Sequence, residues 1–179
     1  MANLIITIIS IALVAIAAIM GAYYGGAAYL EGQAKARAAS FISQGEQIAN
    51  AWRAWSVDRG GTTALPDYDW TDGSSDLVPA YLTAIPIIPT PDYESWRPRD
   101  VANQTPPYVN MRFVRARTSA EVCLQIARMA GHTTIQDFHY IGSGGGDPRY
   151  AVMSQPFDCR QDTGNTDEAT RYHVVYWAF

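Results

Sequence analysis

The first thirty residues are apolar and carry no charge. The stretch MANLIITIISIALVAIAAIM is aliphatic except at Asn3, Thr7 and Ser10, and no charged side chain occurs from Met1 to Leu30. A helix from Leu4 to Tyr24 would be roughly 30 Å long, which is the thickness of the hydrocarbon layer of a bilayer. This pattern predicts an N-terminal helix that is surrounded by lipid or by equally apolar protein.

The helical pattern continues beyond the apolar segment and becomes one-sided. From Ala34 onward small and apolar residues recur at steps of three and four residues, which predicts one continuous helix of about 55 residues. The helix is expected to end near Asp58, because Arg59-Gly60-Gly61 follows. We therefore divide the chain into an apolar helix (1–30), its amphipathic continuation (31–58) and a head (59–179). The small and apolar positions of the continuation are Ala34, Ala38, Phe41, Gly45, Ile48, Trp52 and Trp55. The four large side chains among these positions are expected to pack on the head: Phe41, Ile48, Trp52 and Trp55.

Glycines interrupt the apolar helix near its end. Gly21, Gly25 and Gly26 each cost about 1 kcal/mol of helix propensity relative to alanine. Their spacing allows close approach of membrane helices, because Gly21 and Gly25 form a GxxxG pair. Alternatively, Gly21 to Gly26 is a hinge that unwinds in an assembled state. Three nearby tyrosines fit an aromatic belt at a membrane surface: Tyr23, Tyr24 and Tyr29.

The first part of the head, residues 60–107, is predicted to be an irregular loop. Eight prolines lie between Thr62 and Pro107 and limit the length of any regular element. A short helix is expected near Asp76 to Thr83. Aromatic residues gather here and serve either as loop packing against the long helix or as a partner surface: Tyr68, Trp70, Tyr81, Tyr93 and Trp96.

The second part of the head, residues 108–179, is predicted to hold the regular structure. Alternation from Tyr108 to Val114 predicts a half-buried strand. A capping box at Thr118-Ser119-Ala120-Glu121 opens a helix that Gly131 closes. Residues 142–148 read as a turn between strands at 138–141 and 150–153. The segment from Tyr172 to Phe179 is apolar on both sides, which predicts a central strand. The inward positions of the helix are Val122, Cys123, Ile126 and Ala130. The predicted fold class is α+β, with the long helix packed on an antiparallel sheet.

Charge and cysteine content narrow the function. The net charge is −4, and from Asp58 onward 15 acidic residues face 10 arginines, so no nucleic-acid partner is inferred. Cys123 and Cys159 are the only cysteines and suggest one disulfide in an oxidising compartment. Its loop entropy would contribute about 4 kcal/mol. Two free thiols and, less in keeping with the spacing, a zinc site are the alternatives.

Three stretches make the chain resemble the type IV pilins. MANLIITIISIALVAIAAIM is similar to their mature hydrophobic segment, and Met1 resembles the type IVb subclass that includes the toxin-coregulated pilin. LVPAYLTAIPIIP is similar to the loop after their long helix. SAEVCLQIARMAG, with Cys159 and the closing strand, is similar to the disulfide-bounded region of type IVb pilins. The resemblance covers the full chain.

The resemblance implies a structural role. Such a subunit is stored in the inner membrane, extracted by the pilus assembly machinery, and built into a homopolymeric cell-surface filament whose core is the bundled apolar helices. No basic residue occurs before Lys35, so we expect either that a short basic leader has been removed ahead of Met1, which we favour, or that the N-terminus faces outward. A minor pilin, a pseudopilin of a secretion machine and a monomeric membrane-anchored binding domain are the alternatives. The expected assembly residues are Met1, Asn3, Ile5, Thr7, Gly21, Gly25 and Gly26.

One position departs from the family. Type IV pilins usually carry Glu at the fifth mature position, paired with the N-terminal amine of a neighbouring subunit, whereas this chain has Ile5. An ionised amine without a partner would be costly in an apolar core. The amine is therefore expected to be neutral, methylated, or hydrogen-bonded to Asn3, Thr7 or backbone carbonyls.

Catalytic chemistry finds little support in the sequence. A metal site at His132, Asp137 and His139 would lack a helical pair of ligands. The glycine-rich loop at 142–146 lacks the Lys and Ser or Thr of a phosphate loop. The sequon at Asn103 is followed by Pro106. We expect no enzyme activity and no cofactor.

Overall fold

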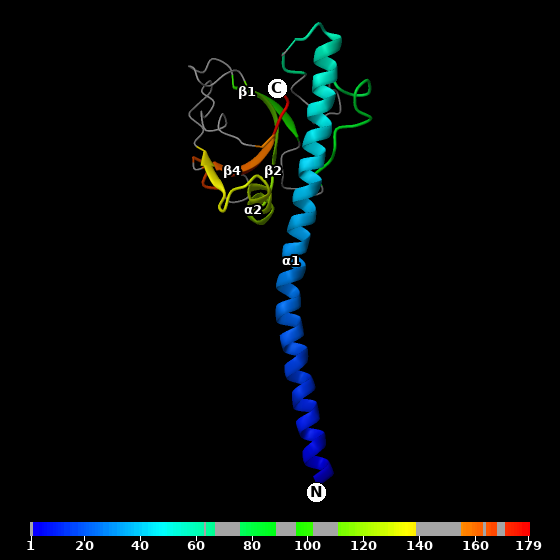
Figure 1. The fold of residues 1–179 in the computed structure, drawn as a ribbon, viewed down its shortest axis with the longest axis vertical. Helices are drawn as coiled ribbons and strands as arrows, with labels where there is room; N and C mark the ends of the chain where they lie inside the picture. The colour runs from blue at the N-terminus through cyan, green and yellow to red at the C-terminus, as the bar shows by residue number, and fades with distance from the viewer. Residues whose placement is uncertain are drawn as a thin grey trace.

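A single helix dominates the molecule (Figure 1). The computed structural model describes residues 2–62, 64–66, 76–88, 96–101, 111–138, 155–162, 164–167 and 171–179. Helix α1 (Ala2–Asp58) is 57 residues long. Its lower half extends away from the rest of the chain, and its upper half lies along one side of a small head. The fold is α+β, as predicted, and its architecture is pilin-like.

The head is built on one sheet of five described strands. Their order is β1-β2-β5-β4-β3, and every pair is antiparallel except β3 with β4, which is parallel. Strand β5 lies in the middle and its first five residues are buried, which confirms the prediction of a central strand near the C-terminus. The strands are β1 (Arg97–Val101), β2 (Met111–Arg117), β3 (Gln136–Phe138), β4 (Phe157–Asp162) and β5 (Tyr172–Trp177).

The core lies between α1 and one face of the sheet. Phe41, Ile48, Trp52 and Trp55 are all buried in it. The sheet contributes alternate residues of its two central strands, because side chains of a strand point to opposite faces in turn. These residues are Val114, Ala116, Val174 and Tyr176.

Gly45 marks the closest approach of α1 to the sheet. A Cβ atom at this position would lie 2.8 Å from the Cβ atom of Tyr176 and 3.1 Å from the ring of Trp96. Trp96 is fixed beside it, because its Nε1 donates a hydrogen bond to Gln44 Oε1 at 3.0 Å. The helix and the sheet can reach this separation only where the helix carries no side chain.

Gly45→Ala is therefore expected to destabilise the head by about 1–3 kcal/mol, the usual cost of overpacking a core. This cost exceeds the roughly 1 kcal/mol that alanine gains in helix propensity. Gly32→Ala is the matched control, because a Cβ atom there meets nothing within 4 Å. Denaturant unfolding of the full chain in detergent micelles measures both variants. A Gly45→Ala protein as stable as the Gly32→Ala protein would show that the interface can relax.

Arg53 fastens the last residues of the chain to α1. Its Nε donates to the carbonyl of Ala178 at 2.7 Å, and its Nη2 donates to the carbonyl of Trp177 at 3.0 Å. The ring of Phe179 meets the edge of Trp52, with 5.7 Å between ring centroids. These contacts hold β5 against the helix at the upper end of the head.

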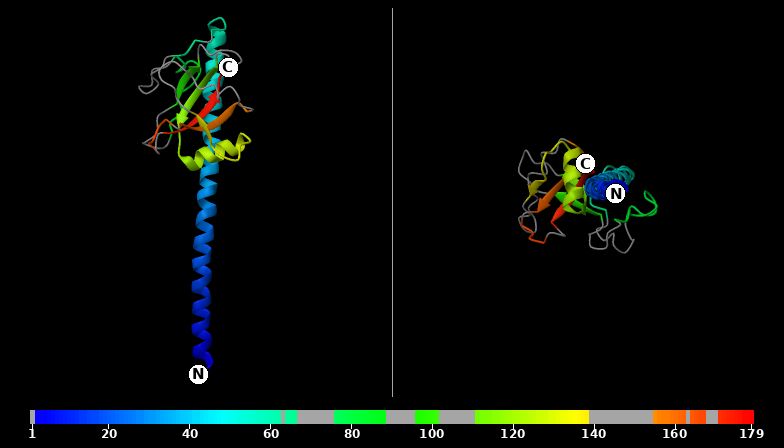
Figure 2. Two further views of the ribbon diagram at one scale, coloured as in Figure 1. Left: turned by 90° about the vertical axis from the view of Figure 1, so that its left-hand side faces the viewer. Right: turned by 90° about the horizontal axis from the view of Figure 1, so that it is seen from below.

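Helix α2 (Ala120–Met129) lies at the lower end of the head and crosses α1 (Figure 2). Its N-cap is Ser119, one residue later than the capping box predicted, and the hydroxyl of Ser119 accepts from the N–H of Val122. At the other end Gly131 adopts φ = 95°, and the N–H of His132 donates to the carbonyl of Ala127. The predicted inward residues of α2 are buried.

Two sequence predictions in the head are wrong. No helix forms near Asp76 to Thr83. Residues 76–81 form a turn instead, since Pro79 has no N–H to donate. The segment 60–107 is not wholly irregular, because β1 occupies Arg97–Val101 at the edge of the sheet, where a proline is tolerated.

Other sequence predictions shift or fall outside the described residues. Strand β2 is buried on both faces, at Phe113 and Val114, rather than half-buried. Strand β4, which carries Cys159, was not predicted. Residues 139–154, with their predicted turn and parts of two predicted strands, lie outside the described residues. The same is true of Met1, Tyr68, Trp70, Tyr93, Asn103, Tyr108 and His139.

Candidate assembly surface

The lower half of α1 has no cover within the chain. Eleven large apolar side chains between Leu4 and Met20 are each at least 52 % exposed. By length and composition α1 could cross a membrane, and the apolar stretch that meets this test has none of its residues buried. Such a surface is unfavourable in water, because exposed apolar patches of this extent are rare on soluble monomers. An apolar N-terminal helix of this kind suggests membrane anchoring or secretion.

The two hydroxyl side chains of this segment, those of Thr7 and Ser10, are satisfied inside the helix. The hydroxyl of Thr7 donates to the carbonyl of Asn3 at 2.8 Å, and the hydroxyl of Ser10 donates to the carbonyl of Ile6 at 2.9 Å. Neither hydroxyl therefore needs water or a partner molecule as acceptor. The segment can enter an apolar environment without the cost of an unmade hydrogen bond at these positions.

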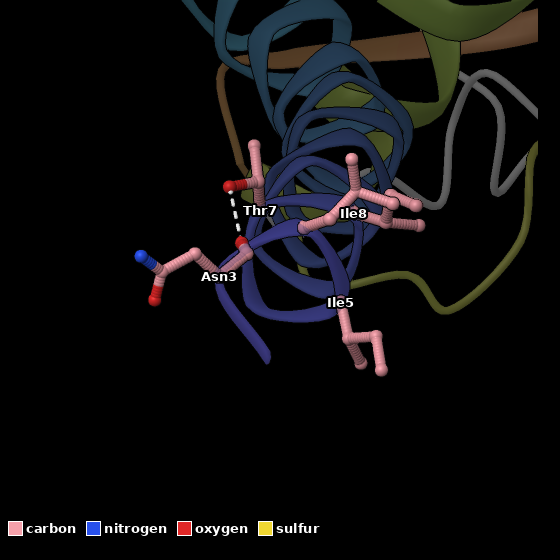
Figure 3. Close-up of a pocket in the computed structure, with 5 residues that line it drawn as sticks. Asn3, Ile5, Thr7 and Ile8 are labelled. Atoms are coloured by element: carbon pink, nitrogen blue, oxygen red, sulfur yellow. Dashed lines mark hydrogen bonds between the residues drawn. The ribbon is translucent and has the colours of Figure 1, made fainter. Parts of the chain in front are cut away.

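The first turns of α1 do not enclose a binding site (Figure 3). The pocket there is lined by Asn3, Leu4, Ile5, Thr7 and Ile8, which all belong to one helix. Figure 3 shows the labelled side chains pointing outward in different directions. Ile5, at the position where type IV pilins usually carry Glu, is exposed. Only another molecule could close this pocket.

The glycines in the lower half of α1, unlike Gly45, have no packing role among the described residues. The helix runs without a break through Gly21, Gly25 and Gly26, and a Cβ atom at any of them would meet nothing within 4 Å. No contact with the head therefore requires glycine. Unwinding at these residues concerns an assembled state and stays a prediction.

The disulfide predicted between Cys123 and Cys159 is present. It joins α2 to β4, the Cα atoms are 5.2 Å apart, and both cysteines are fully buried. The described residues contain no free cysteine. The bond therefore belongs to the core between α2 and the sheet.

A second contact joins β4 to the turn that follows α2. Asp158, 1 % exposed, accepts from Arg160 Nε at 2.9 Å and from the N–H of Cys159 at 2.7 Å, and its carboxylate lies 3.5 Å from His132 Nε2. His132 had been considered as a metal ligand. Among the described residues no group of three or more His, Cys, Asp or Glu side chains is arranged to hold a metal.

The sheet face opposite α1 gathers arginines that the sequence analysis overlooked. Arg97 lies directly across from Arg115, and Arg117 lies across from His173. The signal was present in the sequence as two Arg-x-Arg triplets, RPR and RAR, since alternate residues of a strand share a face. Burial, and then the charges of Arg115, Arg117 and Arg99, lower the pKa of His173 to about 3. His173 is therefore neutral in the folded head.

This predicts a loss of stability in acid. Between pH 6.5, the ordinary pKa of histidine, and pH 3, the unfolded chain binds a proton at residue 173 that the folded head does not. The free energy of unfolding should therefore fall as the pH falls, by about 2–3 kcal/mol between pH 7 and 4.5 from this residue. His173→Gln should lose this part of the pH dependence. Denaturation at several pH values, with the variant compared to wild type at each, measures the difference. If the free energy of unfolding changed with pH in parallel in the two proteins, the pH dependence would not come from His173.

Comparison with protein-family models, curated proteins and solved structures finds no match to this chain. The likeness to pilins is therefore one of architecture: a long apolar N-terminal helix packed on a mostly antiparallel sheet with one disulfide.

Proposed function

We propose that this chain is a structural subunit of a type IV pilus-like extracellular filament. The observation that carries the proposal is the uncovered apolar half of α1, which continues without a break into a half packed in the head. Lipid and the same segment of other copies are equally suitable covers, because both are apolar all round. A subunit can thus wait in the inner membrane and later exchange lipid for neighbouring helices.

The glycines favour a cover made of helices. Gly21, Gly25 and Gly26 together give up roughly 3 kcal/mol of helix propensity, and no contact within the chain compensates for it. Small residues allow helices to approach closely. Close contact with copies of α1 gives these glycines a role that lipid alone would not.

We propose a structural and not a catalytic role for the head. Both cysteines form the disulfide, so neither is a free thiol. Of the three histidines, His173 is buried and His132 lies beside Asp158. In this role the pilus assembly machinery extracts the subunit, and the head determines what the filament contacts at the cell surface.

Electron microscopy of sheared cell-surface material tests the proposal. Filaments whose main protein by mass spectrometry is this chain, and which disappear when its gene is deleted, are the expected result. Recovery of the chain only from membranes, as a monomer, would instead favour a membrane-anchored binding domain. Filaments that contain it in trace amounts would favour a minor pilin or pseudopilin.

Ile5→Glu tests how the helices are held in register. We expect filament yield to be unchanged or lower, because burying isoleucine contributes about 1.5–3 kcal/mol in transfer terms, whereas a glutamate would need a charged partner. Ile5→Leu is the control for shape, and yield is measured by immunoblotting of the sheared fraction. A large gain in yield would show that pairing between a carboxylate and the N-terminal amine is still available.

A further inference from the structure

The head begins directly above the apolar segment of α1, without a stalk. Ala34 is the first residue along α1 that is buried among its described side chains, and Ala38 is fully buried. Leu30, the last residue of the uncharged segment, is only four residues below Ala34. At about 1.5 Å per residue this is about 6 Å. If α1 is inserted in a membrane as far as Leu30, the lowest part of the head must lie at the membrane surface.

Helix α2 forms this lowest part among the described elements. Figure 2 shows it lying across α1 at the end of the head that faces the apolar half. Val122, Cys123 and Ile126 bury its inner side in the same core as Ala34 and Ala38. Its C-terminal turn leaves Arg128 and Met129 exposed. The charge of Arg128 acts on Glu31 of α1, which lies below Ala34, so this turn is close to the lower edge of the head.

The charged residues at this level are mainly basic. Lys35 and Arg37 are exposed on α1, on either side of the buried Ala34 and Ala38 face. Side chains of a helix lean toward its N-terminus, which here is the membrane side. Glu31 is paired with one of them, since its carboxylate lies 2.9 Å from Lys35 Nζ. Glu121 is exposed at the opposite end of α2.

Arg128 reaches the same level as this ion pair. The hydrogen bond from Lys35, then its charge, and to a smaller extent the charge of Arg128 lower the pKa of Glu31. Glu31 therefore stays ionised and is neutralised within the molecule. The exposed cations that remain, Arg37 and Arg128, face the membrane side without an equal number of acids beside them.

The length of the apolar segment fixes where these cations lie. Leu4 to Leu30 spans about 40 Å, which is close to the thickness of a bilayer including its headgroup layers. Residues just above Leu30 are thus at the level of the lipid phosphates. Long basic side chains extend readily into this layer.

We propose that the foot of the head, formed by Lys35, Arg37, Arg128 and Met129, docks on anionic phospholipid headgroups and holds the subunit upright in the membrane before assembly. This inference rests on the membrane-stored state of the proposed function. Each basic residue near an anionic surface strengthens such docking by about fivefold. Met129 adds an apolar tip that enters the headgroup layer.

The test uses the full chain at one copy per lipid nanodisc, so that no second copy can cover the foot. A fluorophore at Thr133→Cys reports docking through quenching by a headgroup-attached nitroxide. Fluorophores at Val57→Cys, about 33 Å above Lys35 along α1, and at Ile11→Cys are the controls for height and for insertion. Discs of phosphatidylcholine are compared with discs containing 30 mol% phosphatidylglycerol.

We expect Thr133 to be quenched more strongly in anionic discs than in neutral ones, and Val57 in neither. The Arg37→Glu/Arg128→Glu protein should lower the ratio of docked to undocked heads at least tenfold, and Arg59→Glu, a reversal at the far end of α1, should not. Equal quenching of Thr133 in both lipids, unaffected by the double reversal, would overturn the inference while Ile11 stays quenched by acyl-chain nitroxides. Loss of quenching at Ile11 would overturn the membrane-stored state itself.

Discussion

A chain that begins at Glu31 is expected to be soluble and monomeric and to form no filaments. The deletion removes the eleven large apolar side chains between Leu4 and Met20 that α1 leaves exposed. Covering them contributes on the order of 10–20 kcal/mol per subunit, since burying one fully exposed side chain of this kind is worth about 1.5–3 kcal/mol and these side chains are 52–70 % exposed. No surface contact between heads would replace a contribution of this size. Analytical ultracentrifugation and electron microscopy measure the result.

Point substitutions in the full chain separate this effect from general damage. Ala15→Asp places a charge in the middle of the apolar segment, which costs about 2.5–3.5 kcal/mol at the centre of a membrane helix, whereas Ala15→Leu keeps the segment apolar. The first should reduce filament yield strongly and the second should not. If the shortened chain formed filaments like those of the full-length protein, the model of a filament core built from α1 would be refuted.

Asp158→Asn is expected to destabilise the head by about 3–5 kcal/mol, because it leaves the charge of Arg160 buried without its carboxylate. Asp158 and Arg160 are 1 % and 3 % exposed, so water does not replace the lost partner. Asp137→Asn, at an exposed position of β3, is the matched control and should change stability by less than about 0.5 kcal/mol. Thermal unfolding in detergent micelles, followed by near-ultraviolet circular dichroism, measures both proteins.

A second variant distinguishes charge burial from packing. Asp158→Asn/Arg160→Met removes both charges while keeping side chains of similar length, and it should recover part of the lost stability. If the double variant is less stable than Asp158→Asn alone, the loss comes from shape at this position and not from an unpaired cation.

The long helix could be predicted because its pattern follows simple rules. A segment that is apolar on all sides needs no partner to be recognised, and the spacing of Phe41, Ile48 and Trp52 identifies the side that meets the head. Strand β5 was predictable for a similar reason, since both of its faces are apolar. The disulfide followed from the two cysteines and the expected compartment.

Strands β1 and β4 were missed because their patterns oppose the rules. Strand β4 reads as polar, and Asp158 and Arg160 are buried there as an ion pair. Strand β1 carries Pro98 between two arginines, a composition that suggests a loop. In β4 the stabilising feature is an ion pair between two side chains of the strand itself, and in β1 it is the edge position in the sheet; the periodicity of apolar residues reports neither.

The place of β5 in the sheet has a consequence for synthesis of the protein. β5 leaves the ribosome after β2 and β4, yet it lies between them and joins the two sides of the sheet. Until residues 172–177 are available, the head consists of strand pairs with open edges, which are marginally stable and prone to wrong pairing. The backbone acceptors of Arg53 also arrive last. Chains that end before this strand would thus remain accessible to proteases, and the sheet of the head would be complete only once β5 has been added.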